Sequence, residues 1–100
     1  MTQDERLRYN KAINVLTYKV IERKYEEVTP TNEQAEAMML AVNALNLLAY
    51  DTGRNYDQQI AILNYHLAQP FAILFKDRYT MKALNQAVYA LKYMLGKTKD

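Results

Sequence analysis

The stretch that decides the fold class is NEQAEAMMLAVNALNLLAY, residues 32–50. Its apolar residues recur at spacings of three and four, which is the periodicity of one face of an α-helix. Four of them follow a heptad-like pattern: Met38, Val42, Leu45 and Ala49. Leu40, Leu47 and Leu48 widen this apolar stripe well past one face. We therefore expect a helix with more apolar surface than a peripheral helix of a bundle needs.

The same periodicity covers most of the chain, and turn signals are few. Three further apolar seams have helical spacing: Tyr9, Ile13, Leu16 and Val20; Tyr56, Ile60, Leu63 and Leu67; Leu84, Val88, Leu91 and Leu95. We predict one all-α domain over residues 1–100, a compact bundle of four main helices at 1–28, 32–50, 55–75 and 80–95, with a tail at 96–100. Pro70 ends or kinks the third helix, because proline removes a backbone donor, and 71–75 can form a fifth short element. The sequence leaves open whether that helix continues through Pro70.

Capping signals mark the predicted helix ends. Two pairs have the spacing of a capping box: Thr2 with Glu5, and Thr31 with Gln34. Asn55 can cap the helix that follows it. Gly53 is free to take a positive φ in the loop at 51–54, and Gly96 is expected as the C′ residue that ends the last helix.

Residue types that most catalysis requires are missing from this chain. It contains no Ser, no Cys, a single His (His66) and only two glycines, Gly53 and Gly96. These absences exclude a Ser or Cys nucleophile beside a base, a thiolate or two-His metal site within one chain, and a glycine-rich phosphate loop. We therefore predict a binding protein with no metal and no cofactor. An enzyme would need active sites between subunits or chemistry by carboxylates alone.

The charge and the cysteine content indicate the cellular compartment and limit the classes of partner. Without disulfides, packing alone must hold the fold, which fits a reducing cytoplasm. The charge-free runs at 37–50 and 58–75 are interrupted by amides and fall short of a membrane span. The net charge is +2, and residues 76–100 carry six basic side chains against Asp77 and Asp100. This excess is too small to predict duplex DNA binding.

The sharpest candidate site is a polar stripe on the last predicted helix. Its members follow i, i+4, i+7, i+11 and i+14 spacing: Arg78, Lys82, Asn85, Tyr89 and Lys92. Cations neutralise phosphate, a phenol ring stacks on a base, and an amide reads a base edge, so the stripe suits an anionic, nucleotide-like ligand. The alternative is an ordinary solvated face. His66 has two interpretations as well, a hydrogen-bonded interface or surface residue or a ligand for a metal shared between subunits.

The apolar surplus of the two middle helices also has two interpretations. It can be the core of the bundle alone, or part of it can seal a homo-oligomer, because leaving several Leu and Ile side chains in water forfeits stabilisation. We expect the chain to self-associate.

Two short patterns carry a resemblance to a known family. Residues 30–34 open a helix with a Pro-x-x-Glu-Gln pattern, and the last helix contains Leu84-Asn85-Gln86-Ala87-Val88. Over residues 29–95 the chain resembles the small all-helical phage proteins that sequester cyclic oligonucleotide signals of bacterial immunity. The resemblance implies a symmetric helical oligomer in the cytoplasm of a bacterial host, holding a cyclic nucleotide at its subunit interfaces without chemistry. The alternative function is a protein–protein inhibitor or adaptor, such as a phage antagonist of a host or CRISPR-type enzyme, acting through helix surfaces.

Overall fold

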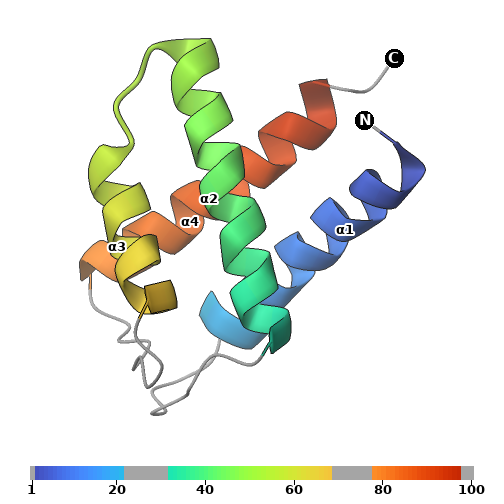
Figure 1. The fold of residues 1–100 in the computed structure, drawn as a ribbon, viewed down its shortest axis with the longest axis horizontal. Coiled ribbons are helices and arrows are strands. Elements are labelled where there is room, and N and C mark those ends of the chain that lie inside the picture. The colour runs from blue at the N-terminus through green and yellow to red at the C-terminus, as the bar shows by residue number, and fades with distance from the viewer. Residues whose placement is uncertain (1, 22–31, 69–77, 98–100) are drawn as a thin grey trace.

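A computed structural model of the chain describes residues 2–21, 32–68 and 78–97, and these residues form an all-α bundle (Figure 1). The elements in chain order are α1 (Gln3–Asn14), the π-helix η1 (Val15–Ile21), α2 (Asn32–Thr52), α3 (Asp57–Ala68) and α4 (Arg78–Lys97). The described residues contain no strand, so the predicted fold class is confirmed.

Helices α2 and α4 form the centre of the bundle. In Figure 1, α2 crosses in front of α4, with α1 on one side and α3 on the other, and α4 contacts all three. Both central helices bury alanines where they meet the core: Ala37, Ala41 and Ala44 on α2, and Ala83, Ala87 and Ala90 on α4. Small side chains let two helices approach closely, because the distance between helix axes depends on the residues at the contact.

The core confirms the predicted apolar seams except at Leu95, which is half-buried outside the core cluster. The largest side chains with almost no exposure come from η1, α2, α3 and α4: Leu16, Met38, Leu45, Leu48, Leu63, Leu84 and Leu91. Tyr9, Ile13, Ile60 and Leu67 lie at its margin, half-buried. Of the leucines that widen the α2 stripe, Leu48 is fully buried and Leu40 half-buried, whereas Leu47 remains 45% exposed.

The first predicted helix is continuous through the described residues but changes type along its length. It is α-helical only to Asn14, and from Val15 it continues as a π-helix, in which each N–H bonds to the carbonyl five residues earlier. The wider turn keeps Val15 and Val20, five residues apart, on the core side together with Leu16. Residues 22–28 of the prediction lie outside the described residues.

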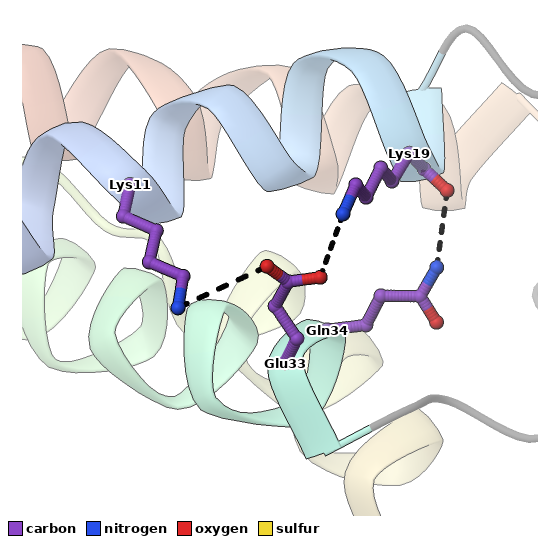
Figure 2. Close-up of polar contacts among 4 residues, drawn as sticks. All are labelled: Lys11, Lys19, Glu33 and Gln34. Atoms are coloured by element: carbon purple, nitrogen blue, oxygen red, sulfur yellow. Dashed lines mark hydrogen bonds and ion pairs between the residues drawn. The ribbon is translucent and has the colours of Figure 1, made fainter.

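Polar contacts join η1 to the first turn of α2 (Figure 2). The Glu33 carboxylate lies between two ammonium groups, 2.8 Å from Lys19 Nζ and 3.9 Å from Lys11 Nζ. The hydrogen bond from Lys19 holds the pKa of the Glu33 carboxyl below its ordinary value. Buried Gln34 donates from Nε2 to the Lys19 carbonyl at 3.1 Å. Its predicted capping partner, Thr31, lies outside the described residues.

The helix ends bear out some of the capping predictions. Thr2 and Glu5 form the capping box, with the Glu5 N–H donating to Thr2 Oγ1 at 3.1 Å. Gly53 takes a φ of 70°, and its N–H donates to the Ala49 carbonyl at 2.9 Å, which is the αL motif that ends a helix.

Other ends differ from the prediction. Gly96 does not end the last helix, because α4 continues through it to Lys97, where the Lys97 ammonium pairs with Asp51 of α2. This helix also begins at Arg78, two residues before the predicted start. Pro70, the element at 71–75 and residues 98–100 lie outside the described residues. None of the described helices is long and apolar enough to cross a membrane.

Candidate ligand-binding groove

Helix α4 positions three of the predicted site residues. It buries Ala83, Ala87 and Ala90 against the core, so the opposite face of the helix is left to solvent. Lys82, Asn85 and Tyr89 lie there at helical spacing, and Tyr89 is 53% exposed. The helix therefore holds a cation, an amide and a phenol ring on one outward face.

The loop between α2 and α3 faces this part of α4. The αL turn at Gly53 reverses the chain, and the Thr52 hydroxyl stabilises the turn by donating to the Leu48 carbonyl at 2.7 Å. Helix α3 begins at Asp57, two residues after the predicted start, so Tyr56 and not Asn55 occupies the N-cap position. Asn55 Oδ1 still satisfies a free donor at this helix end by accepting from the Asp57 N–H at 2.8 Å. Tyr56, which lies between Asn55 and Asp57, is buried in the core and anchors the loop.

The loop, α3 and α4 together line a groove of ≈ 570 Å³ that is open to solvent. Four lining residues belong to the loop and α3, and four to α4: Arg54, Asn55, Tyr56 and Gln59; Lys82, Asn85, Gln86 and Tyr89. This volume falls within the range of about 300–1,000 Å³ that is typical of small-molecule sites. The lining contains two cations, four amides, two phenols and no carboxylate.

The charges of the groove are not neutralised by nearby acids. Among the described residues, neither Arg54 nor Lys82 has a carboxylate partner, whereas four other cations do: Arg8, Lys11, Lys19 and Lys97. Asn85 donates from Nδ2 to the Met81 carbonyl at 2.9 Å, which fixes its side chain and leaves its oxygen and second N–H for a ligand. The groove therefore offers positive charge and hydrogen-bonding groups to an anion.

The structure divides the predicted stripe. Lys82, Asn85 and Tyr89 line the groove. Arg78, the first residue of α4, does not line the groove. Lys92 lies further round the helix and lines a different hollow of ≈ 370 Å³, together with Arg6 and other residues of α1. We therefore remove Arg78 and Lys92 from the candidate site.

Sequence reasoning missed the other half of the groove. Arg54 is predicted only as part of the loop at 51–54 and Asn55 only as a cap, while Gln59 and Gln86 are not predicted as site residues. No periodic pattern in the sequence links these residues to α4. They meet α4 only because α3 packs against it. The one local clue was Gly53, whose positive φ fixes the direction of the loop.

A smaller hollow of ≈ 170 Å³ lies between α1 and α2 and is a weaker candidate for an anion. Two ion pairs neutralise the cations at its rim, Arg8 with Glu36 at 3.2 Å and Lys11 with Glu33 at 3.9 Å. An anion entering it would meet as many carboxylates as cations, so charge favours the α4 groove.

His66 is a buried residue between α3 and α4. Its Nε2 lies 3.4 Å from Thr80 Oγ1, and its ring packs edge-on against Tyr65 with centroids 5.7 Å apart. A hydrogen-bonded His66 was one of the two interpretations, and this contact agrees with it. The expectation that His66 lies at the surface is wrong, because the residue is buried. Over residues 2–21, 32–68 and 78–97, no three His, Asp or Glu side chains are grouped to hold a metal ion.

In comparisons with known proteins, no family model matches the chain, and neither a curated protein nor a solved structure does. The relation to phage proteins that sequester cyclic oligonucleotides therefore stays a hypothesis, resting on the two sequence patterns that suggested it.

Proposed function

We propose that this protein binds an anionic, nucleotide-like ligand in the α4 groove and holds it without chemical change. One observation carries the proposal: Arg54 and Lys82, which lack carboxylate partners among the described residues, line the same groove as exposed Tyr89. Sequestration needs affinity alone, and the groove supplies positive charge, hydrogen-bonding amides and a stacking ring for it.

Each part of a nucleotide has a counterpart in the groove. The Arg54 guanidinium can hold a phosphate through two hydrogen bonds, and the Lys82 ammonium adds a second positive charge. The Tyr89 ring can stack on a base, an interaction worth about 1–3 kcal/mol. The amides of Asn55 and Gln59 supply donors and acceptors for a base edge or a sugar.

The biological setting that we propose is anti-defence. The helix-start pattern at 30–34 and the motif at 84–88 resemble phage proteins that sequester cyclic oligonucleotide signals. A ligand of that kind carries several phosphates and bases, which an open groove with two cations and a stacking ring suits. The protein would act in the cytoplasm of a bacterial host.

A second candidate function is inhibition of a host protein through a helix surface. Tyr65 and Tyr79 are 63% and 60% exposed and flank a mainly apolar hollow between α3 and α4, together with Ala61 and Ile62. Exposed aromatic residues beside an apolar depression are typical of protein interfaces. A host protein that binds Y65A/Y79A as well as the unmodified chain would contradict this candidate.

Calorimetric titration with a panel of mononucleotides and cyclic di- and trinucleotides tests the proposal. We expect saturable binding that weakens as salt rises, because screening reduces attraction between exposed charges. The double variant K82A/Y89A should lower the affinity at least about tenfold, since each tenfold corresponds to about 1.4 kcal/mol and stacking alone supplies that much.

The matched control is K11A/Y18A, which removes the same residue types from α1 and η1. Both of these residues are exposed, and neither lines the groove. If the control loses as much affinity as K82A/Y89A, or if neither variant changes the binding, the assignment of the groove is wrong.

A further inference from the structure

Between Ala37 and Tyr50, the solvent-facing side of α2 carries no charged side chain. Figure 1 looks onto this helix from the side away from α4. Its exposed residues Glu36, Met39, Asn43, Asn46 and Tyr50 follow spacings of three, four, three and four, and Leu47 lies beside them. Met39 is 59% exposed and Tyr50 is 87% exposed. Met39, Leu47 and Tyr50 therefore give this face three large exposed side chains of mainly apolar character, set among the amides of Asn43 and Asn46.

Charge makes this face compatible with a copy of itself. Residues 37–50 contain no Asp, Glu, Lys or Arg, although 24% of the chain is charged. The exposed surfaces of α1 and α4, by contrast, carry several cations, among them Arg8, Lys11 and Lys82. Two identical faces with many charges repel, whereas the α2 face carries only Glu36, which is paired with Arg8, so it is the face suited to a symmetric contact.

The order of residues along the face is symmetric about Asn43. Met39 and Leu47 lie four residues before and after it, and Glu36 and Tyr50 lie seven before and after it. We propose that α2 is the interface for a second copy of this chain, forming an antiparallel helix pair whose two-fold axis passes through Asn43.

In this pair Met39, Asn43, Leu47 and Tyr50 meet suitable partners, and the amide of Asn46 lies opposite the half-buried Leu40. Met39 packs on Leu47 of the second copy, and the Tyr50 hydroxyl donates to the Glu36 carboxylate, which already pairs with Arg8 at 3.2 Å. Asn43 meets its own copy, and an amide is both donor and acceptor, so two can pair reciprocally. An Asn within such a seam fixes the register between helices. Moving the axis one turn to Asn46 would place Met39 opposite Gly53 and lose this match.

The size of the face predicts a weak dimer. From Glu36 to Tyr50 the helix is about 21 Å long, at 1.5 Å per residue. One helix pair of this length buries less than the roughly 800 Å² per partner of a standard stable interface. We therefore expect a dimer that dissociates at concentrations on the order of micromolar. The proposal does not depend on the α4 groove, which lies on other elements.

Sedimentation velocity over a range of concentrations tests the contact, with N43K as the disrupting variant. Two lysines then face each other on the axis, and we expect the dissociation constant to rise at least about tenfold, because like charges that face each other across an interface repel. N64K is the matched control, since Asn64 is exposed on α3. Circular dichroism checks that both variants keep the helical fold.

Cysteine cross-linking tests the register, which is possible because the chain has no cysteine of its own. Under mild oxidation, a mixture of M39C and L47C should form disulfide-linked heterodimers. Either variant alone should not, because its two copies would lie about 12 Å apart along the axis, beyond the roughly 7 Å that a disulfide spans.

Three results would overturn the proposal: a wild-type chain that is monomeric at every concentration, which would leave the face to a different protein; an N43K variant that dimerises as well as N64K; or M39C alone cross-linking as readily as the mixture.

Discussion

Replacing the two glycines by alanine should change stability in opposite directions. Gly53 has a φ of 70°, and the space where a Cβ would be added holds no atom within 4 Å. The cost of Gly53→Ala is therefore purely conformational. A left-handed conformation costs an L-residue roughly 1–2 kcal/mol, and part of this is offset because alanine restricts the unfolded chain by about 0.4–1 kcal/mol. We expect a net destabilisation of about 1 kcal/mol.

Gly96→Ala is the matched control. Gly96 lies inside α4 without a positive φ, and its added Cβ also meets no atom within 4 Å. Alanine is the better helix former, so the variant should gain up to about 0.5–1 kcal/mol, reduced by its place in the last turn of the helix. Gly53→Asn should lose less than Gly53→Ala, because asparagine tolerates the left-handed region.

Urea unfolding followed by far-UV circular dichroism measures these differences, and a thermal scan gives an independent value. A loss of 1 kcal/mol lowers the melting temperature by about 4–8 °C in a domain of 60–100 residues. The reasoning is refuted if Gly53→Ala is as stable as the unmodified chain. It is also refuted if both alanine variants lose similar amounts, since the two sites differ in φ and not in available space.

Three further predictions concern the core and the junction of η1 with α2. Leu48→Ala should lose about 2–5 kcal/mol in urea unfolding because Leu48 is fully buried, whereas Leu47→Ala, next to it but 45% exposed, should stay within about 0.5 kcal/mol in the monomer. Gln34→Leu removes the donor to the Lys19 carbonyl and should cost about 1–3 kcal/mol, with thermal unfolding as the readout. The lowered pKa of Glu33 means that its contribution is present above the ordinary value of 4.5 and lost as the pH falls through the folded-state pKa. Glu33→Gln should therefore be less stable than the unmodified chain at neutral pH and approach it under acid conditions, and a constant difference would contradict this.

Helical periodicity was sufficient to predict the bundle and its core. Leu63, Leu84 and Leu91 were placed on seams by their spacing, and each is buried. The αL turn at Gly53 was also predictable, because glycine is the residue that this conformation favours. Both features depend on residues that are close to one another in the sequence, so the sequence alone is enough to predict them.

The features that were missed depend on contacts between elements. The π-helix at Val15–Ile21 is held where Lys19 meets Glu33 and Gln34, a junction that no local pattern marks. Likewise Lys82 and Tyr89 were found on one helix face, but Arg54 joins them only because α3 packs against α4 and brings the preceding loop with it. Half of the groove was therefore predictable, and the other half required the fold.

The most direct test of the central claim is an amide chemical-shift titration of the isotope-labelled protein with cyclic di- and trinucleotides. The account predicts saturable shifts concentrated in residues 54–59 and 82–89, which weaken as the salt concentration rises. It is contradicted if no nucleotide produces a saturable shift, or if the shifts gather on α1 or around Lys92 and leave Arg54 and Tyr89 unchanged.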